Sequence, residues 1–112
     1  MTKRFALSAA DIKEVAPGRG SCIASDKITV EGRPVRFMYR DQPHNDTDSG
    51  WCFLSGEETQ EYAGDPANFG LYDVNTIANY DREIIDHLDA PAFSAFERQS
   101  GDEPFVAAAF PG

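Results

Sequence analysis

Short hydrophobic runs separated by polar turns occupy the first half of the chain, a pattern typical of β-strands. In the clearest run, Arg36 and Arg40 alternate with apolar positions, which predicts a strand with one hydrated face. A polar stretch rich in Asp, Asn, Ser and Pro follows and predicts a loop over 41–50. Strands are expected over 21–25, with an extended continuation at 28–30, over 35–40 and over 51–54.

The hydrophobic period changes in the second half of the chain. Ile84, Ile85 and Leu88 fall on one helical stripe, which predicts a helix over 82–88 capped by Asp81. Asn75 is the expected N-cap of a helix over 76–80. Further helices are expected over 9–15, where Ser8 is the N-cap, and over 57–63. Residues 69–74 are expected to be extended or irregular. The last two strands are expected to span 92–98 and 104–110.

The order of these elements predicts the fold class. Helices are inserted among strands without strict alternation, which favours α+β with a mostly antiparallel sheet of about five strands and short helices. The length of 112 residues, without an internal repeat, is typical of one domain over 1–112.

The net charge of −9 is concentrated in the middle of the chain. Segment 41–81 contains nine acidic residues and no Lys or Arg, whereas the remaining residues include ten acids and ten bases. Nucleic acid and anionic membranes are bound through basic surfaces, so neither is an expected partner. An acidic surface either keeps a protein in solution or meets a basic protein partner.

The sequence predicts a cytoplasmic location. The first ten residues lack the apolar run of a signal peptide, and no apolar run reaches the length of about 18 residues that would span a membrane. Cys22 and Cys52 are too few for a secreted disulfide framework and lack C-x-x-C spacing. Both are expected to be buried free thiols, with a cross-strand disulfide as the alternative.

Candidate catalytic and metal-binding chemistry is sparse. In the loop His44–Asp48, Asp46 and Asp48 match the first and third positions of a calcium loop, and Glu57 matches the twelfth. The sixth position holds Trp51 where a sharp turn needs Gly, so we expect neither a metal nor a cofactor. No nucleophile motif pairs Ser or Cys with His, and we predict no catalytic residue.

Tyr62 and Tyr72 lie among the acids of segment 41–81, outside the expected strands. Large rings within a charged rim are typical of protein interfaces, although such rings also commonly cover a core. The candidate partner-binding residues are Asp46, Asp48, Glu57, Glu58, Glu61, Tyr62, Tyr72 and Asp73.

Three motifs resemble a known family. They are Ser49-Gly50-Trp51-x-Phe53-x-Ser55-Gly56-Glu57, Tyr72-Asp73-Val74-Asn75-Thr76-Ile77-Ala78-Asn79-Tyr80-Asp81 and Ser94-Ala95-Phe96-Glu97-Arg98. Over residues 20–106 the chain is similar to a small bacterial domain family, classed from gene neighbourhoods as predicted immunity proteins of polymorphic toxin systems. The resemblance implies an α+β fold and a non-catalytic, protective role through toxin binding, and it assigns no catalytic residue.

Four motif residues are expected to be structural. Trp51 would hold the central sheet, Asn75 and Asp81 would cap successive helical turns, and Arg98 would pair with a neighbouring acid. The leading hypothesis is an immunity-like cytoplasmic protein that occludes a basic partner protein such as a toxin. The alternatives are a small-molecule or metal-binding accessory domain that uses the His44–Asp48 loop, and an enzyme whose pocket the sequence does not reveal.

Overall fold

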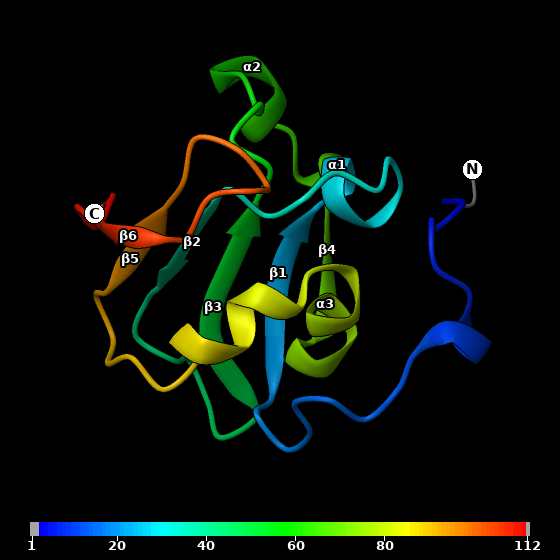
Figure 1. Cartoon of the computed structure of the whole chain (residues 1–112), viewed down its shortest axis with the longest axis horizontal. Helices are drawn as coiled ribbons and strands as arrows, with labels where there is room; N and C mark the ends of the chain where they lie inside the picture. Colours follow the sequence, from blue (N-terminus) through cyan, green and yellow to red (C-terminus); the bar gives the residue numbers. More distant parts are fainter. Residues whose placement is uncertain (1–2, 112) are drawn as a thin grey trace.

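Six strands form a single sheet in the order β4-β1-β3-β2-β5-β6 (Figure 1). The structure is a computed structural model that describes residues 3–111. β1 and β3 are parallel and all other neighbours are antiparallel, which confirms the mostly antiparallel α+β class. The strands are β1 (Ser21–Ser25), β2 (Phe37–Arg40), β3 (Asp48–Leu54), β4 (Phe69–Asp73), β5 (Ala95–Glu97) and β6 (Val106–Ala108).

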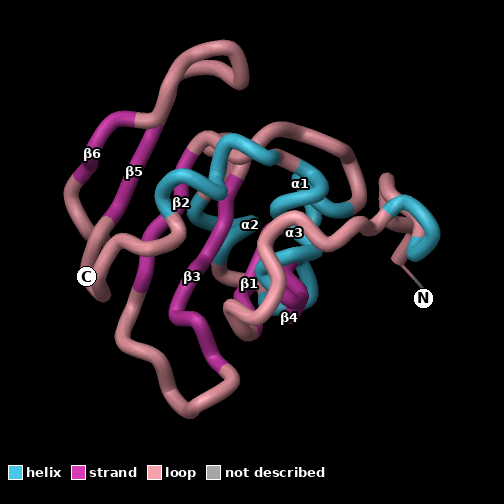
Figure 2. Tube along the Cα trace, turned by 60° about the horizontal axis from the view of Figure 1, so that its bottom comes forward, coloured by secondary structure: helices cyan, strands magenta, loops and turns pink. Residues whose placement is uncertain are grey.

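The helices are short, and half of those in the described residues are 3-10 helices. Helices α3 and η3 lie across one face of β1 and β3 in Figure 1, and α2 lies at the end of the sheet where β3 finishes. Figure 2 shows that the N-terminal segment and β6 lie on opposite sides of the molecule. The helices are η1 (Ala9–Asp11), α1 (Asp26–Thr29), α2 (Gln60–Ala63), η2 (Pro66–Asn68), α3 (Val74–Tyr80) and η3 (Arg82–His87).

The core lies between the sheet and the helices α1, α3 and η3. Alternate residues of each strand point to this side, so Cys22 and Ala24 of β1 lie beside Phe53 of β3. The helices contribute Ile28, Val74, Ile77, Ala78 and Ile84 to the same cluster, and Leu88 follows η3. We call this side the inner face of the sheet and the opposite side the outer face.

Trp51 lies in the centre of the core, with 2% of its surface exposed. Its ring stacks on Phe53 at 6.0 Å between centroids, and the guanidinium of Arg40 lies 5.8 Å from it. The indole Nε1 donates a hydrogen bond of 3.3 Å to the carbonyl oxygen of Leu88. Trp51 therefore joins the sheet to the end of η3.

Arg98 and Asp81 form a buried ion pair between β5 and the start of η3. The Arg98 side chain is fully buried, and its Nε donates to the carbonyl oxygen of Val35 at 2.8 Å. The Asp81 carboxylate also accepts hydrogen bonds from Val35 N at 3.0 Å and Glu83 N at 3.2 Å. This pair connects three segments that lie far apart in the sequence.

Asn75 is not the N-cap of α3. Asp73 caps this helix by accepting from Asn75 N at 2.8 Å. The Asn75 side chain instead accepts from Val15 N and Ala16 N, both at 2.8 Å. Together with Asn79 it fixes the segment that precedes β1. The predicted helix over 9–15 therefore stops at Asp11, because these side chains bind the backbone that a longer helix would need.

Other boundaries also differ from the predictions. Residues 28–30 do not extend β1, because the Ser25 hydroxyl accepts from Lys27 N and begins helix α1 instead. Helix α2 begins only at Gln60, where Thr59 is the cap. The last two strands are shorter than expected, and β4 adds a sixth strand because it pairs with β1 along its whole length.

The polar loop predicted over 41–50 also contains the start of β3, which begins at Asp48. Gly50 makes this possible, because it has a φ of +84° and a Cβ there would collide with the carbonyl oxygen of Asp41. The Gly50 carbonyl in turn accepts a hydrogen bond of 2.8 Å from Asp41 N. Gly50, the first of the two glycines of the first family motif, thus closes the connection between β2 and β3.

Candidate functional site

The candidate partner-binding acids divide into two groups at opposite ends of the sheet. Asp48, at the start of β3, is in register with Ser21 of β1, which is in register with Asp73 of β4. Asp46 lines a hollow together with Asp73. The second group, Glu57, Glu58 and Glu61 with Tyr62, follows the end of β3. The seven residues of β3 separate the groups by roughly 20 Å at about 3.3 Å per residue.

At the first end, hydrogen bonds occupy Asp48 and Asp73. The Asp48 carboxylate accepts from His44 N at 2.9 Å, from Gly50 N at 2.9 Å and from His44 Nδ1 at 3.0 Å. The hydrogen bond from the His44 backbone, assisted by the other two, holds the pKa of Asp48 below its usual value. Asp73 is the cap of α3, whereas Asp46 is exposed. Asp46 is therefore the acid of this group that is most free to meet a partner.

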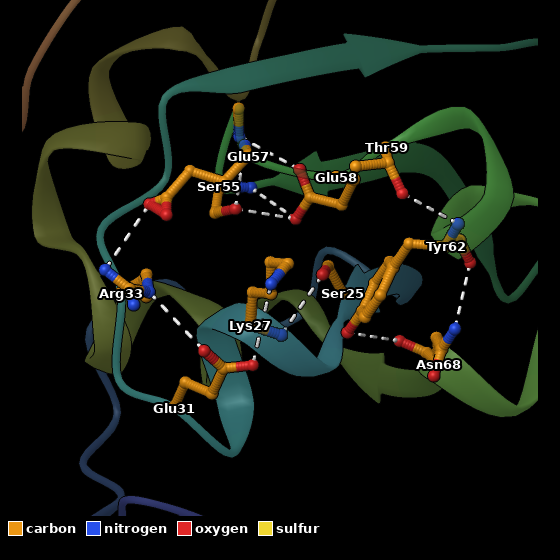
Figure 3. Close-up of polar contacts among 11 residues, drawn as sticks. Ser25, Lys27, Glu31, Arg33, Ser55, Glu57, Glu58, Thr59, Tyr62 and Asn68 are labelled. Carbon is orange, nitrogen blue, oxygen red and sulfur yellow. Dashed lines mark hydrogen bonds and ion pairs between the residues drawn. The ribbon is translucent and has the colours of Figure 1, made fainter.

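At the second end, Glu58 closes the turn after β3 (Figure 3). Its carboxylate accepts from Ser55 N at 2.9 Å, from Ser55 Oγ at 2.7 Å and from Gly56 N at 3.0 Å. Burial acts to raise the pKa of Glu58, but hydrogen bonds from Ser25 and Ser55 outweigh burial and hold this pKa below its usual value. Glu58 is therefore part of the fold and not a freely solvated acid.

Glu57 and Glu61 are more accessible than Glu58. Glu57 lies 3.4 Å from the guanidinium of Arg33, which also approaches Glu31 at 3.5 Å in an exposed network visible in Figure 3. Glu61 is exposed on α2, and no hydrogen bond or ion pair joins its carboxylate to another described residue. Glu61 is therefore the acid at this end of the sheet that is most free to meet a partner, as Asp46 is at the other end.

We expect Glu58→Gln to lower the free energy of unfolding at pH 7 by about 1–3 kcal/mol, because it weakens hydrogen bonds to a charged acceptor. The folded-state pKa of Glu58 is depressed, so its contribution is complete above the unfolded-state pKa of about 4.3 and is lost as pH falls through the folded-state pKa. Urea unfolding measured from pH 7 down to about pH 3 should show the difference between wild type and variant shrinking in acid.

Glu57→Gln is the matched control for this experiment. It removes the neighbouring charge, but its ion pair with Arg33 is exposed, so a loss below about 1 kcal/mol is expected. A Glu58→Gln variant as stable as Glu57→Gln at pH 7 would contradict the assigned role of Glu58.

The two candidate tyrosines differ in their surroundings. The Tyr62 ring packs edge-on against Phe69 at 6.0 Å, and Lys27 Nζ lies 4.9 Å from its centroid. The Tyr72 ring packs against the core, and its hydroxyl lies 3.3 Å from Thr29 Oγ1. Both are half-buried, but Tyr62 lies beside the exposed acid Glu61 of α2 and Tyr72 does not. Tyr62 is the better placed of the two for contact with a partner.

The histidines do not form part of a catalytic arrangement in residues 3–111. His44 bonds Asp48, and His87 packs against Phe96 with 4.5 Å between ring centroids. Neither His is hydrogen-bonded to a Ser or Cys, as an activated nucleophile would require. Over the same residues no group of three or more His, Cys, Asp or Glu side chains is arranged to hold a metal ion.

Both cysteines are free and buried, and they point to opposite faces of the sheet. Burial raises the pKa of the Cys52 thiol to about 11, so the thiol stays protonated at neutral pH. No described helix has the length and apolar character needed to cross a bilayer.

Two exposed residues of the outer face were not predicted as site residues. Leu71 of β4 has 73% of its surface exposed, and its register partner Ile23 of β1 has 45% exposed. Both line a hollow of about 480 Å³ with Tyr39 and Cys52. The sequence around Ile23 contains apolar residues on both sides, so alternation gave no indication that one of the two sheet faces is open.

The family model described as "Immunity protein Imm33 domain" matches residues 22–108, which is more than three quarters of the chain. The match includes all six strands except the first residue of β1. Neither the curated proteins nor the solved structures contain a match to this chain.

Proposed function

This chain belongs to the Imm33 family of immunity proteins, and we propose on that premise that it neutralises a toxin by binding it and covering its active surface. The proposal includes that the chain catalyses no reaction and that its partner presents a basic surface. The single observation that supports the basic partner most is the acidic segment 41–81, which carries the whole net charge of −9.

The local hydrogen bonds of the acids do not remove this charge. Asp65 and Asp73 cap helices while remaining exposed, and Asp46 and Glu61 are exposed at opposite ends of the sheet. Exposed charges of one sign produce a field that attracts a partner of opposite sign and accelerates its association. The charges therefore favour recognition of a basic protein, even though several of these acids also stabilise turns.

A blocking mechanism requires enough surface. Stable interfaces bury about 800 Å² on each partner, and the described molecule exposes 6634 Å² with dimensions of 34 × 32 × 31 Å. One face of the sheet with its adjoining turns is large enough for such an interface. We therefore place the occluding surface across the sheet and not in a single loop.

The accessory-domain and enzyme alternatives have less support. The hollow beside the His44–Asp48 loop measures about 90 Å³, which is small next to ligand pockets of about 300–1,000 Å³. Nothing among the described residues combines a nucleophile with a base.

If charge steers this protein to its toxin, the association rate should fall about tenfold or more when ionic strength rises from about 0.01 M to about 0.15 M, because the Debye length shrinks from about 30 Å to about 8 Å. The probe is a candidate toxin domain, chosen from the genes that adjoin the gene of this chain and carrying an inactivating substitution. Surface plasmon resonance at several salt concentrations measures the association and dissociation rates.

The double variant Asp46→Asn with Glu61→Gln should slow association severalfold at low salt and leave the melting temperature unchanged, because both acids are exposed. Asp86→Asn removes one exposed charge from η3 on the helical side and is the control. An association rate that changes neither with salt nor in the double variant would show that the acidic segment does not steer the partner. Absence of binding by the wild-type chain would contradict the proposed function itself.

A further inference from the structure

An apolar row crosses the outer face of the whole sheet. Leu71 is in register with Ile23, Ile23 with Cys52, and Cys52 with Tyr39. The row continues through Ala95 of β5 to Ala108 of β6. Cys52 belongs to this row as an apolar residue, because its thiol remains protonated at neutral pH.

This row is only partly covered by the rest of the chain. The helices α1, α3 and η3 pack on the inner face, which is the side toward the viewer in Figure 1. On the outer face Ala63 of α2 and Pro66 of η2 border the hollow at one end, and Leu71 and Ile23 stay exposed. A second, smaller hollow shares Ile23, Tyr39 and Cys52 as walls, so the two adjoin. Together they form an apolar groove along the middle strands.

The rim of this groove is acidic at both ends. Asp41 and Asp48 line the smaller hollow. Asp73 ends β4 at the same end of the sheet, in register with Asp48 through Ser21, and its carboxylate caps α3. At the other end, Glu61 and Asp65 flank the α2 and η2 residues that border the larger hollow. No Lys or Arg is among the described residues that line either hollow.

We propose that this groove is the docking site for the toxin, and that it receives an apolar side chain that Lys or Arg residues flank on the toxin surface. The inference rests on the proposed function and specifies where it acts. An apolar centre with a charged rim is the usual anatomy of a protein interface, and the acidic rim selects a basic surround. A second copy of this chain would bring the same acids face to face, and like charges oppose such a dimer.

The test uses variants that change the groove without changing charge. Ile23→Gln combined with Leu71→Gln replaces its two exposed large apolar residues. Phe5→Gln is the matched control, since Phe5 is 48% exposed and packs on Tyr72, whose ring belongs to the inner side. Binding of the inactivated neighbouring toxin domain is measured for all three proteins, and melting temperatures verify that each is folded.

The groove double variant should dissociate from the toxin domain about tenfold faster or more, and its association rate should be nearly unchanged. Apolar contacts at the centre of an interface form after the two proteins have met, so they slow dissociation and have little effect on association. The Phe5 variant should behave as wild type. If the folded double variant dissociated from the toxin domain at the wild-type rate, the proposed docking site would be wrong. The proposed function would not be contradicted by that result. Failure of the wild-type chain to bind would overturn both.

Sedimentation of the free chain tests the alternative occupant. A monomer is expected for wild type and for the groove variant. A wild-type dimer that the groove double variant abolishes would show that a second copy, and not a toxin, covers this face.

Discussion

Arg98→Met is expected to lower the free energy of unfolding by about 3–5 kcal/mol, because it leaves the Asp81 carboxylate buried without its partner. The guanidinium also holds three backbone carbonyls, those of Val35, Gly101 and Glu103, and lies 4.2 Å from the Phe105 ring. Urea unfolding at pH 7, followed by circular dichroism, measures the loss.

A control variant and a double variant distinguish two causes of lost stability. One is the unpaired buried charge, and the other is the loss of an arginine side chain in general. Arg19→Met breaks an ion pair with Asp89 that lies on the surface, and should cost less than about 1 kcal/mol. Arg98→Met combined with Asp81→Leu removes both charges and should be more stable than Arg98→Met alone. An Arg98→Met loss below about 1 kcal/mol would show that the pair does not hold these segments together.

The fold class followed from the order of strands and helices, whereas several boundaries depended on tertiary contacts. Asp73 and Asn75 are both good N-cap residues, so composition does not choose between them. The choice is made by the sheet, because Asp73 is the last residue of β4 to pair with β1 and the chain leaves the sheet there. Residues 28–30 have strand-like side chains, but burial of Ile28 in the core overrides that preference.

Residues of all three motifs that resembled the family make contacts within the fold. Ser55 and Gly56 form the turn that Glu58 closes, Asn75 fixes the segment before β1, and Arg98 pairs with Asp81. These contacts explain why the motifs identify the scaffold. The proposed docking groove takes Leu71 and Ile23, its exposed large apolar residues, from outside the motifs, where motif recognition does not single them out.

The acidic character of the candidate site could be predicted from the sequence, but the arrangement of its residues could not. A run of acids without Lys or Arg is visible in the sequence, but its division between two ends of a sheet depends on the length and direction of β3. The capping roles of Asp65 and Asp73 likewise depend on where helices begin. The open outer face depends on which side the helices cover, and neighbouring apolar residues such as Cys22 and Ile23 give no sign of that choice.

Trp51→Ala is expected to cost about 3–5 kcal/mol of unfolding free energy, because the cavity would lie between β3 and the end of η3, where both elements are fixed. Marginal stability of about 5–15 kcal/mol makes this a large share of the total. Thermal and urea melts followed by circular dichroism measure the loss, since Trp51 is the only Trp and the variant has no Trp fluorescence. Trp51→Phe keeps a ring against Phe53 and should cost less than Trp51→Ala. A Trp51→Ala loss below about 1 kcal/mol would mean that the ring is not part of the core, and the inner face would then compete with the outer face as the surface that meets the partner.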